Sequence, residues 1–175
     1  MNHYEFTGDT LTIDNTTYHR ISATRDLPKH KIHKGTLGGW IEHSVNLTGN
    51  AWVGDNARVN GCSVITGNSS VTDYAIVTDT LVSGNATIKQ HANVNESTVT
   101  GNATISGSAI VIGATATGNS RIYDNAVITV TGKTTISGNA MIFGNAYINT
   151  HKENIISGNT TISGNSRINT DNAMI

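Results

Sequence analysis

The chain has 175 residues, a formal net charge of −1, 13% charged residues and a single cysteine. The near-neutral charge argues against a broadly basic nucleic-acid-binding protein, and Cys62 has no partner for an internal disulfide. No apolar run is long enough to cross a membrane and no signal-peptide pattern precedes the first predicted strand, so we expect a cytoplasmic protein without a membrane partner.

Residues 1–45 lack the periodicity of the rest of the chain. Alternation of apolar and polar residues in Tyr4–Phe6 and Leu11–Ile13, with Gly8-Asp9 between them, predicts a β-hairpin. A further strand is predicted over residues 18–23. We therefore expect this segment to be a small β-structured domain of its own.

The predicted hairpin precedes a long repeat, and a repeat needs a cap over the open end of its core. Residues 1–45 end in the bulky Trp40 and Ile41 and are the natural candidate for that cap. Terminal units of solenoids are usually caps, so we interpret these apolar side chains as a plug for the core rather than a ligand site.

Positive charge is concentrated within the predicted cap, at Lys29, His30, Lys31, His33 and Lys34. A nucleic-acid surface usually interleaves such cations with aromatic side chains, and this run has none. The run is interpreted as a solvated loop, and nucleic acid is not an expected partner.

Residues 46–175 repeat a six-residue phrase: an aliphatic residue, two turn residues that often read Gly-Asn, and then a small residue. The aliphatic markers are Leu47, Val53, Val59, Ile65, Val71, Val77, Val82, Ile88, Val94, Val99, Ile105, Val111, Ala116, Ile122, Ile128, Ile136, Ile142, Ile148, Ile156, Ile162, Ile168 and Ile175. Their regular spacing predicts that they point inward and form a continuous core.

The steps that depart from six residues recur at every third marker. Val77 to Val82 is a step of five residues, for example, whereas Ile128 to Ile136 is a step of eight. A chain that changes length only at every third corner is winding around a three-sided prism, because the other two corners must keep stacking on their neighbours. The sequence thus predicts an all-β, single-stranded, triangular parallel β-helix of about seven coils with an N-terminal β-hairpin cap.

The corner between the first and second faces supports this register. In all seven coils it reads Gly-Asn: Gly49-Asn50, Gly67-Asn68, Gly84-Asn85, Gly101-Asn102, Gly118-Asn119, Gly138-Asn139 and Gly158-Asn159. Gly and Asn reach positive φ at low cost, and stacked Asn side chains can hydrogen-bond along the axis. The small residues that follow the turns, such as Ala51 and Ala57, are expected to pack inside the corners.

The repeated phrase resembles the left-handed β-helix of the bacterial hexapeptide-repeat superfamily over about three quarters of the chain. More narrowly, Tyr18–Asp26, Gly35–Glu42 and Gly49–Val53 look like the start of the YdcK-like proteins of enteric bacteria and their phages. The resemblance implies a left-handed winding, and it implies a bacterial or phage origin. The periodicity alone does not decide the hand.

Enzymes of that superfamily transfer acyl groups from acyl-CoA or acyl carrier protein, typically as trimers with a histidine general base. His151 is the candidate base here, and acetyl-CoA would be the cofactor. It lies in an eight-residue step, where we expect it to cluster with Lys133, Lys152, Glu153 and Asp171 on one edge. The long loop and C-terminal helix of many such enzymes are missing, and polar loops are common without function, so we favour a non-catalytic protein without a cofactor.

The outward residue before each marker describes the faces of the prism. On the third face these residues are Arg58, Ile76, Asn93, Ile110, Val127, Tyr147 and Arg167, whereas the second face, from Trp52 to Thr161, is mostly polar. Ile76, Ile110, Val127 and Tyr147 are expected to form an apolar contact strip. The short Ser-Thr run of the second face is similar to the threonine arrays of ice-binding β-helices, but Arg121 and Met141 interrupt it.

The repeat continues to Ile175, which leaves a sheet edge that could pair end to end with a second copy, be covered by a partner or continue into a longer protein. We therefore expect a homo-oligomer formed through the third face or the C-terminal coil. The expected function is that of a rigid scaffold or protein-binding module, with a host or phage protein as partner. The alternative is the acyl-CoA-dependent transferase with His151 as base.

Overall fold

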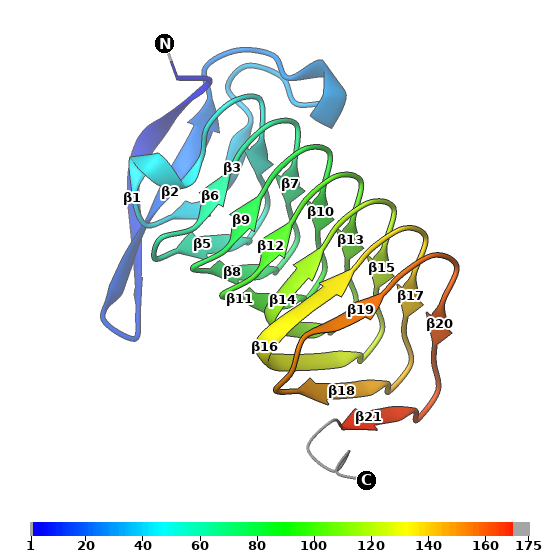
Figure 1. Cartoon of the computed structure of the whole chain (residues 1–175). Helices are drawn as coiled ribbons and strands as arrows, with labels where there is room; N and C mark the ends of the chain where they lie inside the picture. The colour runs from blue at the N-terminus through cyan, green and yellow to red at the C-terminus, as the bar shows by residue number, and fades with distance from the viewer. Residues whose placement is uncertain (1, 170–175) are drawn as a thin grey trace, which may run out of the picture.

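The computed structural model describes residues 2–169, in which a cap precedes a parallel β-solenoid of about seven coils (Figure 1). Each coil carries three short strands separated by turns, and each strand pairs in parallel with its equivalent one coil later. The predicted all-β parallel β-helix is confirmed.

The second face, between the first and second corners, is one parallel sheet of seven strands. The strands are β4 (Trp52–Val53), β7 (Ser70–Val71), β10 (Thr87–Ile88), β13 (Thr104–Ile105), β15 (Arg121–Ile122), β17 (Met141–Ile142) and β20 (Thr161–Ile162). Equivalent positions stack without a register shift, as in the pairing of Ile88 with Ile105.

The first and third faces are joined in one sheet of 14 strands. The third face holds β5 (Arg58–Asn60), β8 (Ile76–Thr78), β11 (Asn93–Asn95), β18 (Tyr147–Thr150) and β21 (Arg167–Asn169), and the first face holds β6 (Val64–Ile65), β9 (Leu81–Val82), β12 (Thr98–Val99) and β19 (Asn154–Ile156). Two longer strands, β14 (Ile110–Ala116) and β16 (Val127–Ile136), turn the third corner and pair with strands on both faces.

The core is a column of aliphatic side chains inside the prism. All the aliphatic markers from Leu47 to Ile148 are buried, and so are the small corner residues such as Ala51 and Ala57. Ile156, Ile162 and Ile168 of the last described coil are only partly buried, because no further described coil covers them. The inward positions are thus the ones that the six-residue period predicts.

The first corner carries the predicted asparagine ladder. Each Nδ2 donates to the Oδ1 one coil later at 2.9–3.1 Å, in the series Asn85, Asn102, Asn119, Asn139 and Asn159. Asn50, in the first coil, instead accepts a hydrogen bond from Arg25 Nη2 at 2.7 Å, because the cap covers this end of the corner. The ladder is therefore confirmed from Asn85 in the third coil to Asn159, and a cap contact takes its place at Asn50 in the first coil.

The cap begins with a hairpin of β1 (Tyr4–Ile13) and β2 (Thr16–Ala23), which pair antiparallel. Its turn is Asp14-Asn15, whose φ angles of 49° and 64° suit the two-residue turns that match strand twist. The predicted turn at Gly8-Asp9 is wrong: the register shifts between Phe6 and Thr10, so these residues form a β-bulge, and Gly8 supplies its φ of 96°.

A third cap strand, β3 (Leu37–Ile41), pairs antiparallel with β2 and parallel with β5. The hairpin therefore extends the sheet of the third face, and the coils advance away from it (Figure 1). The loop before β3 contains the 3₁₀ turn η1 (Pro28–His30), and η2 (Ser44–Asn46) leads into the first coil.

The cap contributes both aliphatic side chains and one aromatic side chain, Tyr4, to the buried core. Ile21 and Ile41 are fully buried at the end of the core. Trp40 points outward from β3, and its backbone pairs with that of Arg58. The Arg20 guanidinium lies over the Trp40 ring, with its Cζ 5.0 Å from the ring centroid. The interpretation of Trp40 as part of the plug is therefore wrong, because β3 already follows the inward-outward alternation of the coils.

Candidate functional site

The structure stacks the predicted apolar strip along the third face. Ile110, Val127 and Tyr147 lie on consecutive coils as paired residues of β14, β16 and β18, whereas Asn93 separates Ile76 from them. Ile110 and Tyr147 have 37% and 36% of their surface exposed, and the other two are half-buried. Three of the four predicted residues are thus contiguous.

The predicted strip omits Ile112, which is two residues beyond Ile110 on β14 and is half-buried. Successive outward positions of a strand are two residues apart, so Ile112 lies on the same face as Ile110. The alternation in the sequence Ile110-Val111-Ile112 is the signal that would have identified it. Ile112 widens the strip at its centre.

The eight-residue steps at the third corner are not simple outward bulges. β16 continues through the corner, and Val130, Thr134 and Thr150 turn inward and are buried. The hydroxyls of Thr134 and Thr150 form a hydrogen bond of 2.8 Å, which satisfies both groups inside the wider coil. The extra residues therefore enlarge the core as well as the corner.

The predicted charged residues lie on the outside of this corner. Lys133 Nζ is 3.9 Å from Glu153 Oε1, and both side chains are at least 70% exposed. His151 Nδ1 forms a hydrogen bond with Thr131 Oγ1, and Lys152 is exposed beside it. Asp171 lies outside the described residues. An exposed ion pair of this kind contributes little to stability.

The basic run of the cap is partly engaged in structural contacts. Lys29 Nζ donates to Asn85 Oδ1, and His30 Nε2 lies 2.9 Å from the carbonyl oxygen of Asn50. Leu27, just before them, is buried against the core. The loop interpretation holds for the exposed Lys31, His33 and Lys34, but Lys29 and His30 dock the loop on the first corner.

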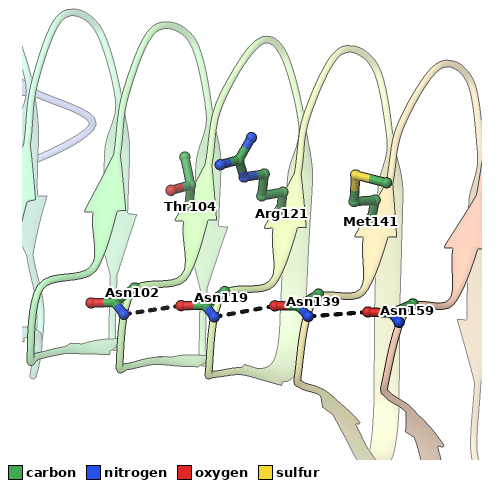
Figure 2. A pocket seen from close by; sticks show the side chains of 7 residues that line it. All are labelled: Asn102, Thr104, Asn119, Arg121, Asn139, Met141 and Asn159. Carbon is green, nitrogen blue, oxygen red and sulfur yellow. Dashed lines mark hydrogen bonds between the residues drawn. The ribbon is translucent and has the colours of Figure 1, made fainter.

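The second face holds a groove that the sequence did not predict. Its volume is about 470 Å³, and the row of Asn102, Asn119, Asn139 and Asn159 forms one wall, with Thr104, Arg121 and Met141 beside it. Figure 2 shows the hydrogen-bonded row and the three side chains on the adjoining strands.

A second hollow of about 370 Å³ continues from the groove across the same face. It shares Thr104 and Arg121 with the groove and adds Lys89, Ser106 and Tyr123. The ring of Tyr123 stacks on Phe143 one coil later, with centroids 4.8 Å apart and planes at 5°. The two hollows together form a polar surface that runs from the first corner to the second.

Residues 2–169 contain no group of three or more His, Cys, Asp or Glu side chains that could hold a metal ion. In the same part of the chain, no helix is both long and apolar enough to pass through a membrane. Comparison of the sequence with protein-family models and with curated proteins gave no match.

Proposed function

We propose that the protein is a rigid, non-catalytic binding module of the hexapeptide-repeat type, which presents its third face to a protein partner. The Gly-Asn corners and the six-residue period support the resemblance to that superfamily, and with it the left-handed winding and the kinship with YdcK-like proteins. A bacterial or phage origin, a cytoplasmic location and a host or phage protein partner belong to the same proposal.

The observation that carries the proposal is the contiguous apolar strip of Ile110, Val127 and Tyr147, with Ile112 at its centre. The strip lies on paired strands of one sheet, so the backbone that carries its side chains is fixed before binding. A pre-organised surface loses little conformational entropy when it binds, and exposed apolar patches commonly mark interfaces.

A second copy of the chain is the first partner to test. Two or three rods can lie side by side through the third face, or two rods can meet through the C-terminal coil, where Ile162 and Ile168 are only partly buried. Other proteins of the host or phage are the next partners, and the exposed corner with Lys133, Lys152 and Glu153 offers them polar contacts.

Light scattering at two concentrations tests the proposal, combined with the variants Ile110→Lys and Val127→Lys. A self-associating protein should show a multiple of the 18.5 kDa chain mass, and both variants should shift it toward the monomer. Thr98→Lys, a half-buried outward position on β12 of the first face, is the control and should keep the wild-type mass.

Pull-down from bacterial extract, with the same variants, tests a partner other than a second copy. Loss of a bound protein with Val127→Lys but not with Thr98→Lys supports the third face as its binding surface. If oligomeric mass and every bound protein stay unchanged in both third-face variants, the proposal is wrong.

The second candidate function is acyl transfer from acetyl-CoA with His151 as general base. Its ring Nδ1 forms a hydrogen bond with Thr131 Oγ1, and a base in such an enzyme is commonly positioned by a hydrogen bond of this kind. Titration with acetyl-CoA to millimolar concentration tests this function, and absence of binding would remove it. If acetyl-CoA binds, acetyl transfer that His151→Gln lowers without weakening acetyl-CoA binding would support His151 as the base.

A further inference from the structure

We propose that the second face binds an anionic oligosaccharide in the groove beside the asparagine ladder. The proposal is independent of the third-face interface, since it uses a different face of the prism and a different class of ligand. It rests on three features of this surface. The ladder asparagines keep unused hydrogen-bond donors and acceptors, Arg121 and Lys89 form no ion pair within residues 2–169, and hydroxyl-bearing residues line the second hollow.

The ladder offers a ligand a repeating set of hydrogen-bonding groups. A primary amide has two N–H donors and two acceptor lone pairs, and the bonds to neighbouring coils use one of each in Asn102, Asn119 and Asn139. One donor and one acceptor therefore remain on each exposed side chain, repeated about every 4.8 Å along the axis. A chain of linked sugars carries hydroxyl groups, which both donate and accept, at comparable intervals.

The positive charges of this face favour an anionic ligand. Arg121 and Lys89 are both exposed, and among residues 2–169 neither forms an ion pair. The outward positions that flank the markers of the second face, from Trp52 to Ser163, contain no Asp or Glu. In Figure 2 the Arg121 guanidinium points away from the row of asparagines. Arg121 also lines the second hollow, together with Lys89.

The second hollow supplies the remaining contacts. Its hydroxyls belong to Thr104, Ser106 and Tyr123, and they lie in the hollow that Lys89 and Arg121 also line. A carboxylate or sulfate would accept charge-assisted hydrogen bonds from the two cations, and the neighbouring sugar hydroxyls would pair with the protein hydroxyls and the ladder amides. An extended acidic glycan lying along the axis uses all of these groups together.

The probes are a hexuronate oligosaccharide, a sulfated oligosaccharide and a neutral oligosaccharide of equal length, titrated into the full chain by calorimetry or by NMR. The first two distinguish carboxylate from sulfate as the recognised group. We expect one or both anionic probes to bind, and the neutral one to bind at least about tenfold more weakly, since it lacks the charge-assisted bonds.

Arg121→Gln and Lys89→Gln identify the site. Each is expected to weaken the anionic probe about tenfold or more, whereas Lys133→Gln, an equal change of charge at the third corner, should leave it unchanged. Circular dichroism checks that each variant is folded, and Arg121→Lys, which retains the charge, should restore part of the affinity.

Three outcomes would overturn the proposal: no binding of either anionic probe at millimolar concentration, equal weakening by Arg121→Gln and Lys133→Gln, or equal affinity for an acidic peptide such as oligoglutamate. The last would show that the face recognises charge alone. None of these outcomes bears on the third-face strip, because Ile110 and Val127 are unchanged in every variant used.

Discussion

Lys29 Nζ, in the cap, donates a hydrogen bond to Oδ1 of Asn85, 56 residues further along the chain. The Nδ2 of Asn85 donates onward to Asn102, so its Oδ1 is the terminal acceptor of the ladder. Lys29 thus supplies the donor that a preceding asparagine would otherwise provide. The contact joins the cap to the coils at a defined register.

Replacement of Lys29 by Met should lower the free energy of unfolding by about 1 kcal/mol, because the terminal acceptor then has only water as a donor. Lys34→Met is the control, since that side chain is exposed in the same loop. Urea unfolding of the two variants checks the difference, and equal stability of both would contradict the role of Lys29 as the end of the ladder.

Asn119→Asp tests the direction of the ladder. A carboxylate cannot donate to Asn139 Oδ1, so at neutral pH the variant should lose about 1–2 kcal/mol. The protonated acid can donate, so folding raises the pKa of this carboxyl, and the folded state binds more protons than the unfolded state as the pH falls. The stability loss relative to wild type should therefore shrink at pH 4.

Asn93→Asp is the control for the ladder variant, since Asn93 is exposed on the third face and outside the ladder. Its effect should be small at neutral pH. Urea unfolding at pH 7 and pH 4 measures both variants against wild type. A constant difference between Asn119→Asp and wild type at the two pH values would show that the ladder bond does not contribute.

Two glycines of the first corner separate backbone strain from steric clash. Gly101 and Gly158 have nearly equal φ angles of 69° and 68°, but a Cβ on Gly101 would lie 2.9 Å from the backbone N of Gly118, whereas a Cβ on Gly158 meets nothing within 4 Å. Gly158→Ala should lower the free energy of unfolding by about 1–2 kcal/mol, which is the penalty of a positive φ alone. Gly101→Ala should lower the free energy of unfolding clearly more, because the coils that carry Gly101 and Gly118 must move apart. Thermal unfolding ranks the stability of the two variants. Equal melting temperatures would contradict the close approach of the coils.

His3 and His30 should make the stability depend on pH. Burial lowers the pKa of both side chains from the ordinary value of 6.5, and nearby cations, Arg25 for His3 and Lys29 for His30, lower the pKa further, although hydrogen bonds to the carbonyls of Ala51 and Asn50 partly oppose this. The unfolded chain therefore binds protons first as the pH falls, and stability should decrease from about pH 7 to about pH 5.

The double variant His3→Gln, His30→Gln should flatten this dependence, whereas His33→Gln, at an exposed position of the same loop, should not. Urea unfolding at about pH 7.5 and about pH 5.5 provides the comparison, because these two values lie above and below the ordinary pKa of histidine. If the double variant loses as much stability on acidification as wild type does, the two histidines do not carry the effect.

The coil was predictable because its rule is local. An aliphatic residue every six positions must point inward for the core to be continuous, and Gly-Asn at the corner fits a turn of positive φ. The structure accordingly buries Val53 and Ile148 at their predicted places and builds the ladder from Asn85 to Asn159. The Gly8-Asp9 turn was mispredicted because a glycine at positive φ also suits a β-bulge.

The sequence by itself thus determined the parallel coil, its triangular section and which side chains face inward, because these follow from the six-residue period and from the recurrence of its irregular steps at every third marker. Tertiary structure decided the contacts between segments far apart in the chain. The cap covers Trp52, which its period places outward, and buries it to 2% exposure. Lys29 meets the ladder, and Arg121 and Lys89 line one hollow, because the fold of the cap and the stacking of successive coils set which outward side chains become neighbours.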